Sequence, residues 1–171
     1  IMMLAAAVAG ICFAFAGKGE ENAVGGNTEY LRVHIRANSN SQEDQAVKYR
    51  VRDKVVEFLT PTVADCLTKE EAIKQIGNRL GEISAAADRE LRANGYTYGA
   101  RASLRAEEFP TRVYDGVTLE AGVYDALILE LGTGEGDNWW CVVYPPLCFT
   151  GGNANVVYKS KIAEIIRGFF S

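Results

Sequence analysis

The spacing of apolar residues changes twice along the chain, and this change restricts the fold more than any other feature. Within residues 30–37, Leu31, Val33 and Ile35 alternate with polar residues, which is the period of a β-strand. Across residues 41–94 the apolar residues recur every three or four positions, as on the buried face of a helix. The period of two then returns. The sequence therefore predicts an α+β domain in which one strand precedes the helices and the other strands follow them.

Two helices are expected in the middle region. The first has apolar residues at intervals of four, namely Val47, Val51, Val55 and Leu59. Pro61 is expected to end it, because proline lacks the N–H that a helix needs. The second is expected to run from the capping box of Thr68 and Glu71 to the stop signal Asn94-Gly95. The two helices are expected to form a hairpin.

The second half of the chain reads as a series of strands followed by a helix. The expected strands cover residues 96–105, 111–114, 117–119, 122–131 and 139–143. Asp115-Gly116 predicts a tight hairpin turn between the second and third of these. Apolar residues spaced between Tyr158 and Phe169 predict a C-terminal amphipathic helix. We therefore expect residues 29–171 to form a single α+β domain with a mostly antiparallel sheet.

The beginning of the chain has a different composition. Residues 1–17 contain no charged side chain, and all 18 basic and 22 acidic residues lie from Lys18 onward. Such a segment is typical of a signal peptide or a membrane anchor, and a buried core helix with no polar face would be unusual. Residues 18–28 are small and polar, with two adjacent glycines, which is typical of a flexible tether. The sequence thus predicts a secreted or membrane-anchored domain whose N-terminal segment contacts a membrane.

Charge and residue inventory exclude several function classes. The net charge is −4 and no run of Lys or Arg occurs, so no nucleic-acid partner is expected. A single histidine, His34, and four cysteines without a CxxC pair predict neither a metal site nor a cofactor. His34 belongs to the polar face of the first strand, where a solvated or hydrogen-bonded surface position is expected. The glycines of residues 132–136 lead into a strand and not a helix, which favours a hairpin loop over a phosphate-binding loop. No catalytic residues are predicted.

The cysteines suggest one disulfide. Cys141 and Cys148 lie close together in sequence, with two prolines between them that can bend the chain back. In an exported protein cysteines commonly pair, so this disulfide is the natural candidate. Cys66 is either a rival disulfide partner for one of these cysteines or a free thiol.

Two long motifs resemble a known family. Residues 136–149 (GDNWWCVVYPPLCF) and residues 36–41 (RANSNS) resemble the signature blocks of the stage II sporulation protein R family. Residues 109–111 (FPT) and 121–126 (AGVYDA) match further blocks in the correct order. The resemblance runs from about Leu31 to Phe149.

This resemblance implies a signalling function. Members of the family are exported by the forespore into the space between the forespore and mother-cell membranes. There they activate a membrane-embedded aspartic protease that processes the sigma-E precursor, and they carry no known catalysis of their own. The alternative is an exported cell-wall-directed hydrolase or another extracytoplasmic enzyme.

Eight residues are candidates for binding the partner: Asn38, Asn40, Asp44, Arg52, Asp53, Trp139, Trp140 and Tyr144. For the short polar residues before the first helix, capping of that helix is the favoured alternative to partner contact. For the two tryptophans, strand alternation sends one of them inward, so each is a candidate for either the core or an interface.

Overall fold

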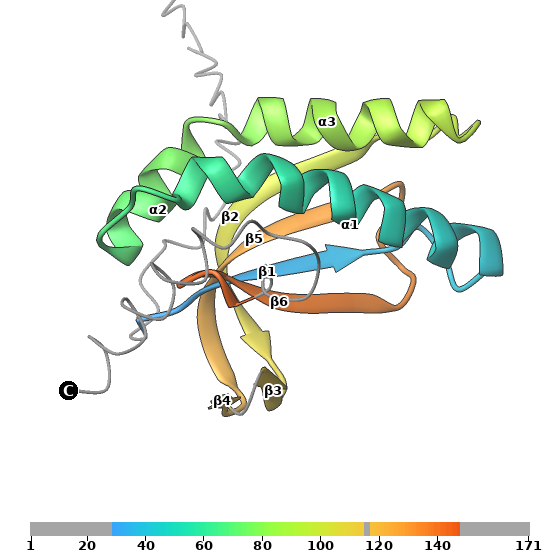
Figure 1. Cartoon of the computed structure of the whole chain (residues 1–171). Helices are drawn as coiled ribbons and strands as arrows, with labels where there is room; N and C mark the ends of the chain where they lie inside the picture. The colour runs from blue at the N-terminus through green and yellow to red at the C-terminus, as the bar shows by residue number, and fades with distance from the viewer. Residues whose placement is uncertain (1–28, 115–116, 148–171) are drawn as a thin grey trace, which may run out of the picture.

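A computed structural model describes residues 29–114 and 117–147, which form a sheet covered on one face by helices (Figure 1). The strands are β1 (Leu31–Arg36), β2 (Ala100–Phe109), β3 (Arg112–Tyr114), β4 (Val117–Leu119), β5 (Gly122–Leu131) and β6 (Asn138–Tyr144). The helices are α1 (Gln42–Val63), α2 (Lys69–Gly77) and α3 (Leu80–Ala93). The predicted α+β class is confirmed.

Strand β1 lies inside the main sheet, whose order is β2-β5-β1-β6. It pairs in parallel with β5 and antiparallel with β6, while β2 pairs antiparallel with β5. The sheet is therefore mixed but mostly antiparallel. The prediction that residues 132–136 form a hairpin loop was wrong, because β5 and β6 are not neighbours and their connection crosses the end of β1. Strands β3 and β4 pair with each other as a separate two-stranded sheet, as the hairpin signal predicted.

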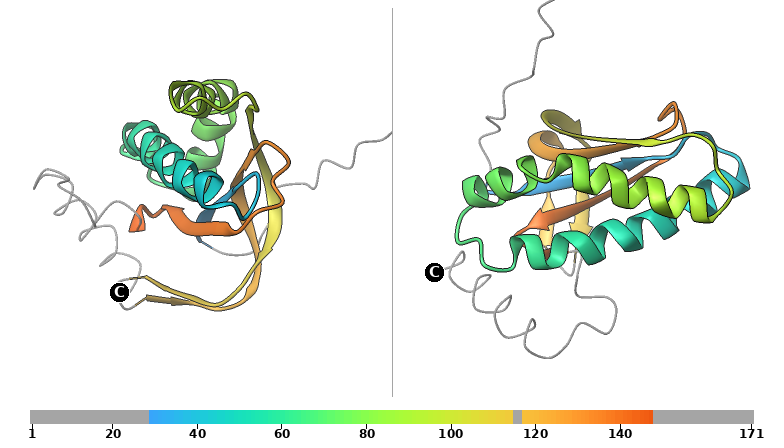
Figure 2. Two further views of the ribbon diagram at one scale, coloured as in Figure 1. Left: turned by 90° about the vertical axis from the view of Figure 1, so that its right-hand side faces the viewer. Right: turned by 90° about the horizontal axis from the view of Figure 1, so that it is seen from above.

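The helices pack their apolar stripe on one face of this sheet. Helices α1 and α3 lie side by side above it when the molecule is viewed along the sheet (Figure 2). Their completely buried side chains meet those of Leu31, Ile35 and Leu127 from the strands. The contributing helix residues are Val51, Val55, Leu59, Ala72, Ile76, Ile83, Ala87 and Leu91. The predicted helical hairpin is thus present, with its second arm divided.

Two predicted helix boundaries were wrong. Helix α1 continues through Pro61 to Val63, because a proline in the last turn removes only one hydrogen bond from a helix that is about to end. The predicted helix from Thr68 to Asn94 is broken near Asn78, whose backbone N–H closes the end of α2 by donating to the carbonyl of Lys74. Thr68 caps α2 by accepting a bond from the Glu71 N–H, as the capping box predicted.

The outer edge of β2 is closed by side chains of α3. Asp88 accepts a hydrogen bond from the Ala100 N–H at 2.6 Å, and Ser84 accepts one from the Ala102 N–H at 2.9 Å. A side chain at a sheet edge satisfies backbone groups that would otherwise attract another strand. Helix α3 therefore covers one face of the sheet and also occupies hydrogen-bonding groups on the outer edge of β2.

Several expectations concern parts of the chain outside the described residues. These are the signal or anchor segment 1–17, the tether 18–28, the turn Asp115-Gly116, Cys148 and the C-terminal helix near residues 158–169. Among the helices of residues 29–114 and 117–147, none has the length and hydropathy needed to cross a membrane.

The loop after β1 packs tightly against the loop before β6. Gly136 donates its N–H to the carbonyl of Ala37 at 2.8 Å, and a Cβ at this position would overlap the carbonyl oxygen of Ser39. Gly132 in the same loop has a φ of 58°, a conformation that other residues rarely adopt. These two glycines allow the β1–α1 and β5–β6 loops to meet.

We expect Gly136→Ala to lower the free energy of unfolding by about 2–4 kcal/mol, because the added methyl group must displace backbone. The control is Gly81→Ala in α3, where the added Cβ has nothing within 4 Å. That variant should be neutral or stabilising by up to about 1 kcal/mol, since glycine disfavours helix. Urea unfolding monitored by circular dichroism measures both values. Equal effects from the two substitutions would contradict the tight contact.

Candidate functional site

The β1–α1 loop carries the predicted candidates Asn38 and Asn40, the first turn of α1 carries Asp44, and all three side chains make hydrogen bonds inside the fold. Ser41 is the N-cap of α1 and accepts the Asp44 N–H. Asn38 donates to the Asp44 carboxylate at 2.8 Å and accepts the Thr133 N–H at 3.0 Å. Asn40 accepts the Asp137 N–H at 2.6 Å. The polar block therefore caps the helix and binds the β5–β6 loop to the end of β1.

Asp44 is the centre of this network. Its buried carboxylate accepts hydrogen bonds from Ser39 at 2.5 Å, Tyr98 at 2.6 Å and Asn38 at 2.8 Å. Burial by itself raises the pKa of the carboxyl group, but these donated bonds outweigh burial and hold the pKa of Asp44 below its ordinary value. The ionised form is thus the one that the fold stabilises.

The lowered pKa predicts a pH-dependent contribution to stability. A carboxyl group with a lower pKa in the folded state stabilises the fold above its unfolded pKa of about 4, and loses this effect as the pH falls through its folded pKa. We expect wild type to exceed Asp44→Asn by about 2 kcal/mol in free energy of unfolding near neutral pH, with the gap shrinking toward pH 2. Urea unfolding across pH 2–7 measures this gap. A difference that stays constant over that range would contradict a lowered pKa for Asp44. Tyr98→Phe removes one of the three donors to Asp44, so its free energy of unfolding near neutral pH should lie between those of wild type and Asp44→Asn.

A second group of candidates gathers between α1 and β6. We call Tyr49, Arg52, Asp53 and Trp139 the Arg52 patch. The guanidinium carbon of Arg52 lies 5.0 Å from the ring centroid of Tyr49 and 5.7 Å from that of Trp139. Its Nη2 lies 2.6 Å from Asp53, whose side chain is 66% exposed, and Tyr49 is 45% exposed. An exposed pair of this kind contributes only about 0–1 kcal/mol to stability, so its position at the surface is available for recognition.

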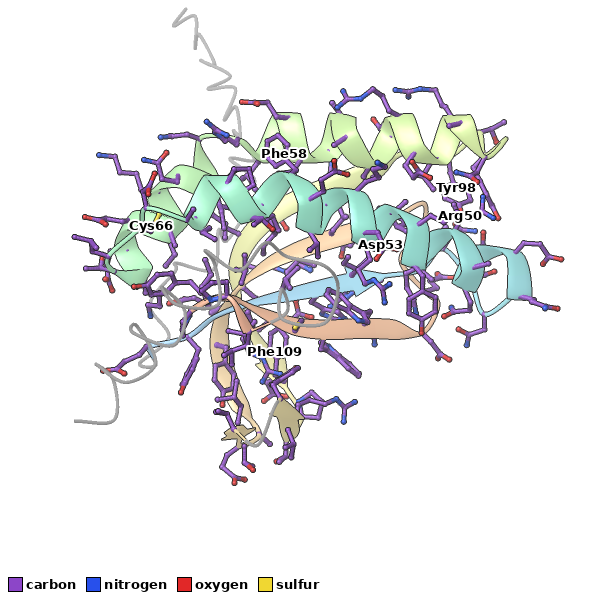
Figure 3. The ribbon with its side chains drawn as sticks, viewed as in Figure 1. Arg50, Asp53, Phe58, Cys66, Tyr98 and Phe109 are labelled. Atoms are coloured by element: carbon purple, nitrogen blue, oxygen red, sulfur yellow. The ribbon has the colours of Figure 1, made fainter. Side chains whose placement is uncertain are left out.

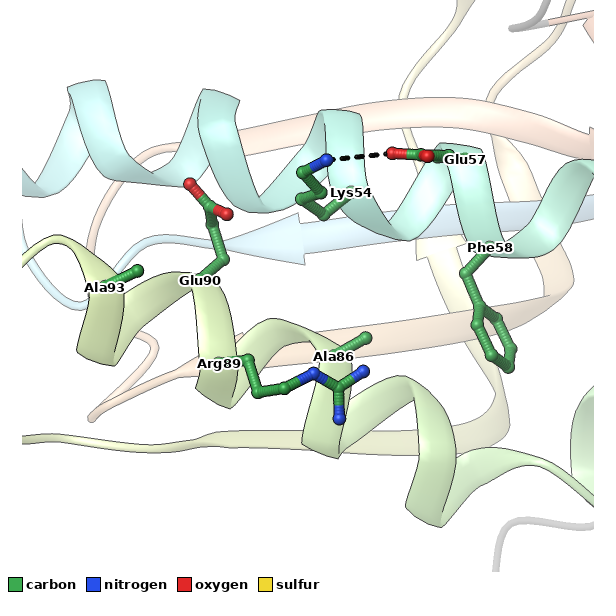
Figure 4. A pocket seen from close by; sticks show the side chains of 7 residues that line it. All are labelled: Lys54, Glu57, Phe58, Ala86, Arg89, Glu90 and Ala93. Carbon is green, nitrogen blue, oxygen red and sulfur yellow. Dashed lines mark hydrogen bonds and ion pairs between the residues drawn. The ribbon is translucent and has the colours of Figure 1, made fainter.

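A groove between α1 and α3 is lined mainly by charged and small residues (Figure 4). Its volume is about 510 Å³. Lys54 and Glu57 on its rim pair with each other at 3.0 Å, and Arg89 and Glu90 line the α3 side. The charges of this groove balance, and its lining residues include no serine, cysteine or histidine.

The sheet face opposite the helices is the third region, and we call it the Arg32 face. Strand alternation places Arg32, His34 and Arg36 of β1 on it, together with Glu107 and Phe109 of β2. Phe109 lies on the side of the sheet away from the helices (Figure 3). The cross-strand neighbours from the other strands are Tyr124, Ala126, Ile128, Glu130, Trp140 and Val142.

Arg32 is completely buried, although it carries a charge. Its guanidinium carbon lies 4.2 Å from the centroid of Phe109 and 4.8 Å from that of Tyr124. Nη2 donates to the Tyr114 hydroxyl at 2.9 Å. Each ring is worth about 0.5–2 kcal/mol, whereas burying an ion costs several kcal/mol unless an opposite charge accompanies it. Among the described residues no carboxylate pairs with this guanidinium, so the ring contacts only partly offset its burial.

The rest of the face holds a charged network. Arg36 bonds both Glu107 and Glu130, the latter at 3.2 Å, and Arg105 lies 3.1 Å from Glu130. His34 Nδ1 lies 3.3 Å from the Glu107 carboxylate. Burial raises the pKa of Glu107, but His34 and the two arginines lower it by more. These acidic groups are therefore already neutralised by Arg36 and Arg105.

His34 was predicted to be a solvated or hydrogen-bonded histidine at the surface. This prediction was wrong, because His34 is buried, with only 3% of its surface exposed. Phe109 and Trp140 cover its ring at centroid distances of 5.8 Å and 5.4 Å. The His34–Glu107 pair has no serine or cysteine nucleophile in contact among the described residues. Nor do those residues contain a cluster of three or more His, Cys, Asp or Glu side chains able to hold a metal ion.

The two cysteines in the described residues differ in state. Cys141 is disulfide-bonded, whereas Cys66 is a buried free thiol near the α1–α2 connection (Figure 3). Burial raises the pKa of the Cys66 thiol, which disfavours the reactive thiolate. The predicted partner of Cys141, Cys148, lies outside the described residues, so the identity of this pair stays a prediction.

Comparison with known proteins shows the family. A family model described as "Stage II sporulation protein R" matches residues 27–154, a range that includes all three regions above. The chain belongs to the stage II sporulation protein R family. It is 38% identical over 134 residues to stage II sporulation protein R of Bacillus subtilis (strain 168). That alignment covers 78% of this chain and 60% of the relative's length. The resemblance seen in the motifs is confirmed, and the protein has a sporulation-related role.

No solved structure matches this chain. The positions of the two family motifs in space are therefore described from the present structure. The RANSNS block forms the loop network around Asp44, and the NWWC block forms β6 at the edge of the main sheet. The two motifs meet where the Asn40 side chain accepts the Asp137 N–H at 2.6 Å.

The predicted binding residues do not form one cluster. Arg52, Asp53 and Trp139 come together in the Arg52 patch, while Trp140 lies on the opposite face of the sheet. Tyr144 is buried in the main core. Asn38, Asn40 and Asp44 are engaged by the loops. Their role in partner binding stays a prediction for every one of these residues.

Sequence reasoning missed Arg32, Tyr49 and Glu107. The alternation of residues 30–37 places Arg32 with His34 on the polar face of the first strand, but it gives no reason to expect aromatic rings against that face. The Phe109-Pro110-Thr111 block was the available signal, since Phe109 is the ring that touches both Arg32 and His34.

Proposed function

We propose that this protein is an exported sporulation signal that activates a membrane-embedded aspartic protease, which then processes the sigma-E precursor. The observation that carries the proposal is the family match across residues 27–154. The chain spans 60% of the relative's length, so the activity and partner are proposed here for the matched domain. In this proposal the protein acts by binding and performs no chemistry.

The Arg52 patch supports such a binding function. Arginine and large aromatic residues dominate the binding energy of protein interfaces, and here Arg52 is held between two rings on a rigid helix and strand. Its side chain therefore loses little freedom when a partner docks. An activator must bind the active state of its receptor more tightly than the inactive state, because only differential affinity shifts the equilibrium. We assign that contact to the Arg52 patch.

We expect Arg52→Ala and Tyr49→Ala each to reduce precursor cleavage at least tenfold, because truncation of a central interface residue commonly costs about 2 kcal/mol or more. The assay uses the full chain added to vesicles that carry the protease and the sigma-E precursor. Lys54→Ala is the matched control, since Lys54 is a basic residue of the same helix that pairs with Glu57 beside the α1–α3 groove. It should retain wild-type activity.

Circular dichroism and urea unfolding show whether each variant remains folded. Trp139→Phe extends the test without removing the ring that packs on the core. If folded Arg52→Ala and Tyr49→Ala activate cleavage as well as Lys54→Ala, the patch is not the receptor contact. If the chain alone hydrolyses cell-wall fragments, the non-catalytic proposal fails.

Export is part of the proposal and rests on the uncharged residues 1–17. We expect the native protein in the space between the forespore and mother-cell membranes, either released or anchored. Fractionation of sporulating cells, with a cytosolic marker as control, locates the protein. Mass spectrometry of its N-terminus distinguishes release from anchoring. Recovery of the intact chain only with the cytosolic marker would contradict export.

A further inference from the structure

Four side chains on the Arg32 face have buried polar atoms without a hydrogen-bond partner among the described residues. These atoms are Nε and Nη1 of Arg32, both ring nitrogens of His34, Nε1 of Trp140 and Oε2 of Glu107. His34 Nδ1 lies 3.3 Å from the Glu107 carboxylate and Glu107 Oε2 lies 3.7 Å from Arg105 Nε, so the atoms of Arg32 and Trp140 and Nε2 of His34 are the ones left without a neighbouring charge. Buried polar groups in proteins are nearly always hydrogen-bonded, and a charged one without a partner is the most costly case. Several such atoms on one face point to a ligand that supplies the missing partners.

Arg32, His34 and Trp140 are arranged in a row. The Phe109 ring lies against both the Arg32 guanidinium and the His34 ring, with centroid distances of 4.2 Å and 5.8 Å. Trp140 is the cross-strand neighbour of His34, with ring centroids 5.4 Å apart. Arg32 and His34 are two residues apart on β1, so their side chains are spaced by the repeat of an extended chain.

The chemistry of these atoms defines the ligand. Arg32 lacks an anionic acceptor, which a carboxylate provides in the strongest form. Trp140 Nε1 is only a donor and requires a carbonyl-type acceptor. His34 Nδ1 lies 3.3 Å from the Glu107 carboxylate, so Nε2 is the ring nitrogen left for a backbone group of the ligand. An extended polypeptide offers all three groups.

We propose that the Arg32 face binds an extended acidic segment of a partner protein, with an Asp or Glu carboxylate on Arg32 and backbone groups on His34 and Trp140. This interaction does not depend on the identity of the receptor proposed above, and it uses the sheet face opposite to the Arg52 patch.

Charge complementarity supports an acidic occupant. The face carries five arginines (Arg32, Arg36, Arg101, Arg105 and Arg112) against two glutamates (Glu107 and Glu130). The chain as a whole has a net charge of −4, so this face is positive while the rest of the chain is negative on balance. Both glutamates are bound by Arg36 and Arg105, which leaves Arg32 as the buried arginine of this face without an anion among the described residues.

Access to Arg32 involves Tyr114. The Tyr114 hydroxyl is its one hydrogen-bond partner among the described residues, at 2.9 Å. Tyr114 belongs to the β3–β4 sheet, which is not hydrogen-bonded to the main sheet. A carboxylate that replaces this hydroxyl exchanges a neutral acceptor for a charged one, and charge-assisted hydrogen bonds are about twice as strong.

The test uses the purified full chain and two short peptides, acetyl-Gly-Glu-Gly-amide and its neutral counterpart acetyl-Gly-Gln-Gly-amide. Nuclear magnetic resonance follows the Arg32 Nε–H and Trp140 Nε1–H signals, which are assigned by their loss in Arg32→Met and Trp140→Phe. We expect both signals to shift saturably with the glutamate peptide and much less with the glutamine peptide at matched ionic strength. Inorganic phosphate is titrated as a third probe.

Variants distinguish a binding role from a structural one. Arg32→Met should abolish the saturable shift of Trp140 and keep or raise the thermal midpoint, because it removes a buried charge that lacks an anion. Arg101→Met removes an exposed charge of the same face and should preserve the shift. If Arg32→Met fails to fold, the wild-type titration still decides the matter through the Trp140 signal, which Trp140→Phe assigns independently. Equal shifts with both peptides, no saturable shift, or tighter binding of phosphate than of the glutamate peptide would overturn the proposal.

Discussion

The pairing of β1 with both β5 and β6 is the constraint on which the rest of the structure depends. In sequence β1 opens the described domain, yet in space it lies between two strands from the other end of it. The parallel pair with β5 requires a long crossover, which the segment from α1 through β4 provides. The antiparallel pair with β6 then requires the β5–β6 connection to pass the end of β1, where Gly132 and Gly136 allow it to approach. The Asp44 network forms at this crossing, so the RANSNS motif serves to close the sheet.

The alternation of β1 gives its two faces different functions. Leu31, Val33 and Ile35 meet the helices and bury apolar surface, which stabilises the domain. Arg32, His34 and Arg36 face the other way, among aromatic rings and carboxylates. A one-residue slip of β1 would exchange these faces and place three basic groups under the helices. The register of the central strand therefore fixes both the core and the basic character of the opposite face.

Local patterns predicted the elements well, because periodicity and capping depend on neighbouring residues. The strand at Leu31–Arg36, the cap at Thr68 and the strand at Gly122–Leu131 all follow from such signals. The parallel pairing of β1 with β5 could not be predicted in this way, since the period of a strand does not identify its partners. The burial of His34 was missed for a related reason. Alternation shows which residues share a face, but it does not show which side chains from distant strands pack against that face.

The two surfaces differ in what they contribute to the fold. The Arg52 patch is partly exposed, and its Arg52–Asp53 ion pair adds little to stability, so the fold can lose that ion pair without unfolding. Arg32 is the opposite case. Within residues 29–114 and 117–147 only rings and one hydroxyl lie against this buried cation, and such a cation weakens the fold that contains it. Methionine would fill the same space at lower cost. A residue that lowers stability where an apolar one would raise it requires a benefit outside stability, and the free donor atoms of Arg32 indicate that this benefit is recognition.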